Sequence, residues 1–177
     1  MLAVGAVVLT IFDKNGTDEA TVVLALRLTA YSSLLIYLLL FIARPMRQLV
    51  DTHLTSTLKK NRRYFGIALA GSHTVHLVLI INYVLGLHIP WHNLFIGGVA
   101  YSFLYLMLIT SFDAPAAAIG PDAWRRLHKA GLYWIGGTFT FTLSNNLVAN
   151  PDSLIRQIVI ALILAAISIR VIAFLRQ

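Results

Sequence analysis

Two histidines, His73 and His76, lie three positions apart in the stretch GSHTVHL, inside a long apolar run without an acidic residue, lysine or arginine. Such strongly polar groups are costly inside a membrane helix, and they usually face the bundle interior or a ligand. An imidazole there can coordinate a metal or bond to a neighbouring helix, and both roles stay open. On one helix the two rings point about 60° apart, so they cannot clamp opposite sides of one metal. A ligand pair would need a second helix.

The second helix is expected to be the one that begins WRRLHKAGLYW, in which His128 lies about one turn inside a basic edge. A neutral imidazole with an open nitrogen is a usual axial ligand of haem iron. His53 lies in a basic loop and is expected to be solvated. His88 and His92 have a proline and a tryptophan between them, which indicates an interfacial anchor rather than a metal chelate.

The composition is that of a membrane protein. Of the 177 residues, 58% are hydrophobic and 12% are charged, and the mean hydropathy is +0.78. A span needs about 20 residues to cross the hydrocarbon core. The pattern predicts an all-α, six-span helical bundle that forms a single transmembrane domain over residues 1–177. The predicted spans, of which the first is short, are 1–12, 20–43, 63–87, 94–112, 124–149 and 153–175.

The basic residues are distributed unevenly between the two sides of the predicted bundle. Eleven of the 14 fall in the loop after the second span, around the start of the fifth, or at the end of the sixth. Because cytoplasmic loops are rich in Lys and Arg, this distribution predicts that both termini are cytoplasmic. With the charge placed in this way, nucleic-acid binding is not expected, and the lipid bilayer is the expected surrounding.

Three stretches resemble the ferric reductase-like transmembrane domain family, and in particular its haem-binding membrane subunits. RRYFGIALAGSHTVH is similar to the family's third span and aligns its deep histidine with His76. TSFDAPAAAIGPDAWRRLHKAGLYW is similar to the end of its fourth span and the start of its fifth, with His128 at the Leu-His position. LRLTAYSSLLIYLLLFIARPMRQ is similar to its second span. The resemblance covers residues from about Ala25 to the end of the chain.

The resemblance implies a b-type cytochrome subunit in the bacterial inner (cytoplasmic) membrane. Such a subunit passes electrons from quinol to a partner at the outer face, and the partners are other membrane or periplasmic subunits. It implies haem b with iron held by His76 and His128, His73 as the reserve for the deep position, and a possible quinone. Relatives carry a further histidine thirteen residues after the first one of the fifth span, where this chain has Phe141.

Depth along the helices leaves three arrangements open. At 1.5 Å per residue, His76 and His73 lie about 20 and 15 Å from the basic edge, whereas His128 and Phe141 lie about 6 and 25 Å from it. The chain could hold haem with one histidine and an open or non-histidine sixth position, supplied for instance by Asn145, Asn146 or water. It could pair His73 with His128 across tilted helices. It could also lack haem, with Phe141 filling the space.

The sequence has no glycine-rich nucleotide loop, no cysteine and no acidic residue in the middle of a span. It therefore predicts no catalytic residue and no self-contained enzyme, and it argues against a proton pump. Arg27 is expected to reach the membrane interface or to meet a haem propionate or quinone. The alternative function is a haem-free subunit that keeps the fold for assembly of a larger membrane complex.

Overall fold

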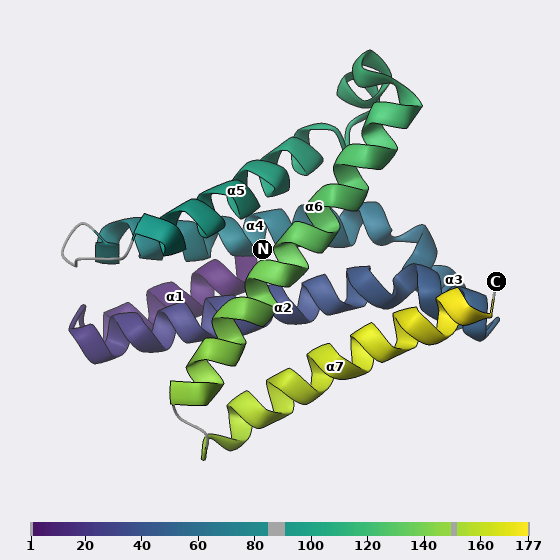
Figure 1. Cartoon of the computed structure of the whole chain (residues 1–177). Helices are drawn as coiled ribbons and strands as arrows, with labels where there is room; N and C mark the ends of the chain where they lie inside the picture. The colour runs from purple at the N-terminus through teal and green to yellow at the C-terminus, as the bar shows by residue number, and fades with distance from the viewer. Residues whose placement is uncertain (1, 85–90, 150–151, 177) are drawn as a thin grey trace.

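The structure, a computed structural model, describes residues 2–84, 91–149 and 152–176, and within these ranges the chain forms helices and no strand. The described helices are α1 (Leu2–Asn15), α2 (Glu19–Leu49), α3 (His53–Lys60), α4 (Arg62–Val84), α5 (Trp91–Ile109), α6 (Asp113–Ala149) and α7 (Leu154–Leu175). Figure 1 shows α2, α4 and α7 running in similar directions, with α5 above them and α6 crossing them obliquely, and with α3 and the end of α7 together at one end. The prediction of an all-α bundle is therefore confirmed.

Three helices are each long and apolar enough to cross a membrane, namely α2, the described part of α4 and α7. The pair α5 and α6 passes the same test together and bends by 113° between the two helices. Large apolar side chains stay exposed on the outside of the bundle, including Leu164 at 58% and Phe174 at 73%. An apolar outer surface of this kind is what a helical membrane protein presents to lipid.

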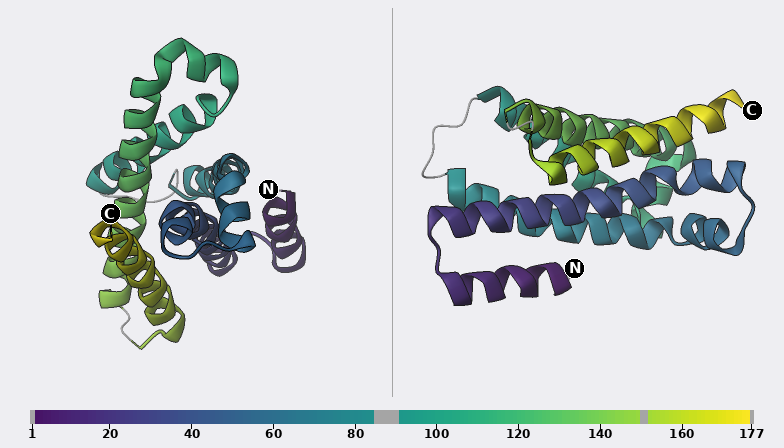
Figure 2. Two further views of the ribbon diagram at one scale, coloured as in Figure 1. Left: turned by 90° about the vertical axis from the view of Figure 1, so that its right-hand side faces the viewer. Right: turned by 90° about the horizontal axis from the view of Figure 1, so that it is seen from below.

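The first helix is short. At 1.5 Å per residue, the 14 residues of α1 span about 21 Å, less than the roughly 30 Å hydrocarbon core. Figure 2 shows α1 beside only part of α2. The chain then turns at Gly16, and Asp18 caps α2 by accepting a hydrogen bond from the Thr21 backbone N–H at 3.0 Å. Hydrogen bonds from Thr21 lower the pKa of the Asp18 carboxyl, because they favour its charged form.

Helix α2 continues past the predicted end at residue 43, through Pro45, to Leu49. Proline has no N–H, so the carbonyl of Phe41, four residues earlier, loses its helical donor. The Arg170 Nη1 of α7 donates to that carbonyl at 3.0 Å. A side chain from another helix thus satisfies the group that proline leaves free, which explains why the helix can persist there.

Helix α6 contains a break that separates the loop from the predicted span. Gly120 has a φ of 77° and a ψ of 163°, which is non-helical, and Pro121 begins the long segment that follows. Proline suits the first turn of a helix, because its missing N–H would be unpaired there anyway. The predicted span 124–149 therefore corresponds to the part of α6 after this break, and residues 113–119 form a short helical turn before it.

The most extensive contact between described helices lies between α2 and α4. It uses small side chains: Ser33 and Ser72 are fully buried, and their hydroxyl oxygens lie 2.9 Å apart. Ala25 and Ala70 add two further small contacts, exposed at 0% and 1%. Small residues let membrane helices approach closely, and hydroxyl bonds across the interface add modest stability. This interface fixes the face of α4 that carries the two deep histidines.

Candidate functional site

A cavity of about 590 Å³ lies between α2, α4, α5 and α6, and both His73 and His76 line it. Its volume falls in the range of small-molecule and cofactor sites. Within the described residues, no Cα atom of α4 comes within 8 Å of a Cα atom of α6. The two helices are thus held apart at the level of the cavity and meet only through side chains.

The imidazole of His76 is oriented by Thr29 of α2. Thr29 Oγ1 lies 2.8 Å from His76 Nδ1 and also bonds to the carbonyls of Ala25 at 2.8 Å and Leu26 at 3.0 Å. A hydroxyl has one hydrogen, and we assign it to the backbone carbonyls at 2.8 and 3.0 Å, so that the Thr29 oxygen accepts from His76 Nδ1–H. The tautomer that results leaves the Nε2 of His76 with a free lone pair. This is the arrangement of a histidine that ligates a metal through Nε2.

His73 lies in a stack of rings. Its ring centroid is 5.1 Å from that of His76, 4.9 Å from that of Tyr101 and 5.3 Å from that of Phe139. The Nδ1 atom of His73 is buried and has no hydrogen-bond partner in the described parts of the chain. A buried polar atom without a partner is costly, so an additional hydrogen-bonding or coordinating group at this position would stabilise the site.

The opposite wall of the cavity belongs to α6 and carries no histidine among its described lining residues. Phe139 and Phe141 line it instead, together with Thr142 and Asn145. Arg27 of α2 also lines the cavity and is exposed, so a cation lies at its edge. The site therefore offers imidazole on one side, aromatic carbon on the other and one positive charge at the rim.

His128 lies in a different environment. Its Nε2 is 3.1 Å from Thr110 Oγ1, and its ring stacks on Trp124 with centroids 4.1 Å apart. The Thr110 hydroxyl donates to the Leu106 carbonyl at 2.7 Å, so its oxygen accepts from His128 Nε2–H. His128 lies near enough to Arg62, at the start of α4, to interact with its charge. His76 follows Arg62 by 14 residues, or about 21 Å along the helix.

The structure thus brings His73 and His76 together and holds His128 separately, at the basic end of the bundle. His53 is exposed, as expected, at the first residue of α3. His88 lies outside the described residues, and so do the side chains of His92 and Asn146. No group of three or more His, Cys, Asp or Glu that could hold a metal ion occurs in the parts of the chain that the structure describes.

Comparison of the chain with protein-family models, curated proteins and solved structures finds no match. A function is therefore inferred from the residues of the site itself.

The residues of the cavity fit a haem with one protein ligand. The free Nε2 of His76 is a suitable axial donor, the Nδ1 of His73 has no hydrogen-bond partner among the described residues, and the aromatic walls suit a flat apolar ring.

Two features of the site could not be predicted from the sequence of α4, because both come from other helices. The Thr29 partner is 47 residues away, and Tyr101, which stacks on His73, comes from α5.

Proposed function

We propose that this chain is a b-type cytochrome-like membrane subunit that passes electrons from quinol to a partner protein at the outer face. One observation carries the proposal: a cavity between separated helices is lined by two histidines, of which one has an open Nε2 and the other an unpartnered Nδ1. The resemblance of the α4 and α6 stretches to ferric reductase-like domains supports the same assignment.

His76 is the residue that would hold the haem iron, and no histidine of α6 lines the cavity among the described residues. The bond to Thr29 holds the imidazole in the tautomer that a ligand needs. Asn145 lines the cavity and could reach the other side of the ring. The pairs that the sequence suggested, His76 or His73 with His128, would require His128 to leave its bond to Thr110.

When bound, haem b would supply a carrier for single electrons in the apolar part of the membrane. The chain's own residues bind and shield it. Phe139, Phe141 and Tyr101 would give it apolar aromatic walls, and Arg27 would offer a positive charge to a propionate or to a quinone at the rim.

The proposal includes the topology. The chain would cross the bacterial inner membrane six times, with a short first span and both termini in the cytoplasm. The concentration of Lys and Arg around α3, the start of α6 and the end of α7 supports this orientation. Other membrane or periplasmic subunits would supply the substrate chemistry that this chain does not carry.

A haem-free subunit with a role in assembly of a larger membrane complex is the second candidate. It is favoured by the α6 wall of the cavity, where Phe141 takes the place of the second histidine, and by the bonded state of His128. In that case the bond from His76 to Thr29 would serve only to join α4 to α2.

The haem content of the purified protein separates the two functions. After expression with added haem precursor, extraction and chromatography should give about one haem b per chain if the cytochrome proposal is right. His128→Ala should keep that haem, because His128 does not line the cavity. No haem in the wild-type protein, together with co-purification at a fixed ratio with larger membrane proteins, would support the assembly role instead.

A further inference from the structure

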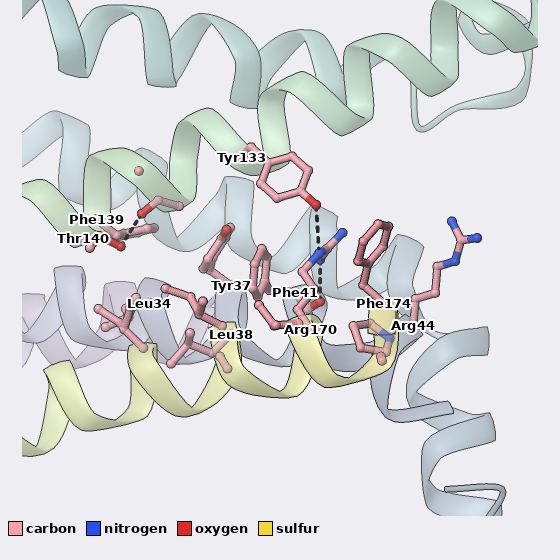
Figure 3. A pocket seen from close by; sticks show the side chains of 18 of the residues that line it. Leu34, Tyr37, Leu38, Phe41, Arg44, Tyr133, Phe139, Thr140, Arg170 and Phe174 are labelled. Atoms are coloured by element: carbon pink, nitrogen blue, oxygen red, sulfur yellow. Dashed lines mark hydrogen bonds between the residues drawn. The ribbon is translucent and has the colours of Figure 1, made fainter. Parts of the chain in front are cut away.

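A second and larger cavity, of about 890 Å³, lies between α2, α6 and α7. Figure 3 shows Leu34 and Leu38 toward one end of it, the aromatic rings of Tyr37, Phe41 and Tyr133 along it, and Arg44 at the opposite end. The cavity is therefore apolar at one end and positively charged at the other. An amphiphilic molecule has the same division.

Three cations line the basic end, namely Arg44, Lys129 and Arg170, and no described residue that lines the cavity is acidic. Arg170 is held firmly in place. Its Nη1 donates to the Phe41 carbonyl and its Nε to Tyr133 Oη, both at 3.0 Å. Its guanidinium carbon lies 4.4 Å and 4.9 Å from the centres of those two aromatic rings. A guanidinium has five N–H donors, so three remain for another acceptor.

Arg62 adds a fourth positive charge nearby. It lies close enough to Arg44 and Arg170 to be repelled by both, and its buried Nε has no hydrogen-bond partner among the described residues. A buried charge needs a partner, because its desolvation is otherwise uncompensated.

The described carboxylates at this end of the bundle are engaged elsewhere. Asp51 pairs with Arg47, Asp113 with Arg63 and Asp122 with Arg125. Arg44, Arg62 and Arg170 are therefore left without a carboxylate partner in the described parts of the chain. These cations are therefore available to an anion that enters the cavity.

We propose that this cavity binds an anionic phospholipid, with its phosphate between Arg170, Arg44 and Lys129 and an acyl chain along the leucine end. Basic pockets between membrane helices bind anionic lipid headgroups in this way. A quinone has no negative charge for these cations, and a free phosphate would leave the apolar walls bare. The proposal stands independently of haem, which concerns the other cavity.

The test compares phosphatidylglycerol with phosphatidylcholine on the purified full-length chain in detergent, with bound lipid measured by native mass spectrometry. The wild-type protein should prefer phosphatidylglycerol. Arg44→Gln combined with Lys129→Gln should lower its apparent affinity roughly 25-fold, at about fivefold for each cation. These two side chains are exposed and have no hydrogen bond or ion pair to another described residue, so the fold should persist. Arg170 is less suitable, since it also joins α7 to α2.

Arg125→Gln combined with Arg126→Gln is the matched control. It removes the same number of positive charges from the basic end of the bundle, but neither residue lines the cavity. The proposal predicts less than a twofold change for this control. It is overturned by any of four results: no headgroup preference in the wild type, an equal loss in the control, an undiminished preference in the first double variant, or displacement of phosphatidylglycerol by ubiquinone or glycerol phosphate.

Discussion

The hydrogen bond between His76 and Thr29 joins the middle of α4 to the first half of α2, with 2.8 Å between His76 Nδ1 and Thr29 Oγ1. Because the Thr29 hydroxyl hydrogen is directed to a backbone carbonyl, the bond also selects the protonation state of the imidazole. At His128, a bond of the same kind to Thr110 occupies Nε2 rather than Nδ1. Two histidines with similar threonine partners thus differ in the ring nitrogen that is free to bind a metal.

Thr29→Val should weaken haem binding by about 10- to 100-fold, the usual effect of removing the group that orients a metal ligand. Valine keeps the shape of threonine but cannot accept the His76 Nδ1–H. The measurement is the rate of haem transfer to an excess of a haem-scavenging protein. Thr140→Val is the control, because its hydroxyl bonds only to the Gly136 carbonyl in the described structure, beside the other cavity. Equal rates for the two variants would show that Thr29 does not orient a ligand.

At the scale of the helices, Arg170 and Pro45 form a compensating pair across α2 and α7. Proline removes the donor for the Phe41 carbonyl, and Arg170 replaces it at 3.0 Å. Arg170→Met should therefore destabilise the protein, and by about 1 kcal/mol less in a Pro45→Ala background, where the helical N–H is restored. The measurement is thermal or denaturant unfolding, in detergent, of the wild type, the two single variants and the double variant. The interaction free energy between positions 45 and 170 follows from the four stabilities. Additive effects of the two changes would rule out this pairing.

Neighbouring glycines of α6 provide a second test of helix packing. A Cβ at Gly136 would overlap the Tyr37 hydroxyl and lie 3.0 Å from its Cζ, whereas Gly137 has nothing within 4 Å of the same position. The Tyr37 hydroxyl donates to the Leu132 carbonyl at 2.9 Å, so it cannot move freely. Gly136→Ala should cost about 1–3 kcal/mol of stability. Gly137→Ala should be neutral or stabilise by up to about 1 kcal/mol. If thermal unfolding shows no difference between them, α2 and α6 do not pack as described.

The sequence predicted the long helices well, because apolar runs of about 20 residues have few other structures open to them. It did not predict the continuation of α2 beyond Pro45, because the donor that permits it comes from α7, 125 residues later in the chain. The break at Gly120 and the short helix α3 were also missed, since both lie in segments between the predicted spans, where periodicity says little. The deep histidines could be identified because they lie in an apolar run. Their partners Thr29 and Tyr101 could not be predicted, because they belong to two other helices and meet the histidines only when the helices pack.

At the scale of the whole molecule, the absence of cysteine makes the proposed orientation directly testable. Thr17→Cys and His53→Cys each place one thiol in an exposed position, at opposite ends of α2. A membrane-impermeant maleimide applied to intact cells should label position 17 and should label position 53 only after permeabilisation. This outcome follows from the positive charge around α3. Labelling of position 53 in intact cells would reverse the orientation.

The account depends most on the claim that the imidazole of His76 holds iron inside the bundle. The most direct test is the visible spectrum of the purified, dithionite-reduced protein, recorded for the wild type, His76→Ala and the exposed-histidine control His53→Ala. We expect a sharp α band of haem b in the wild type and the control, and its loss in His76→Ala. A wild-type protein without Soret absorption after haem-replete expression, or a His76→Ala variant with an unchanged α band, would contradict the account.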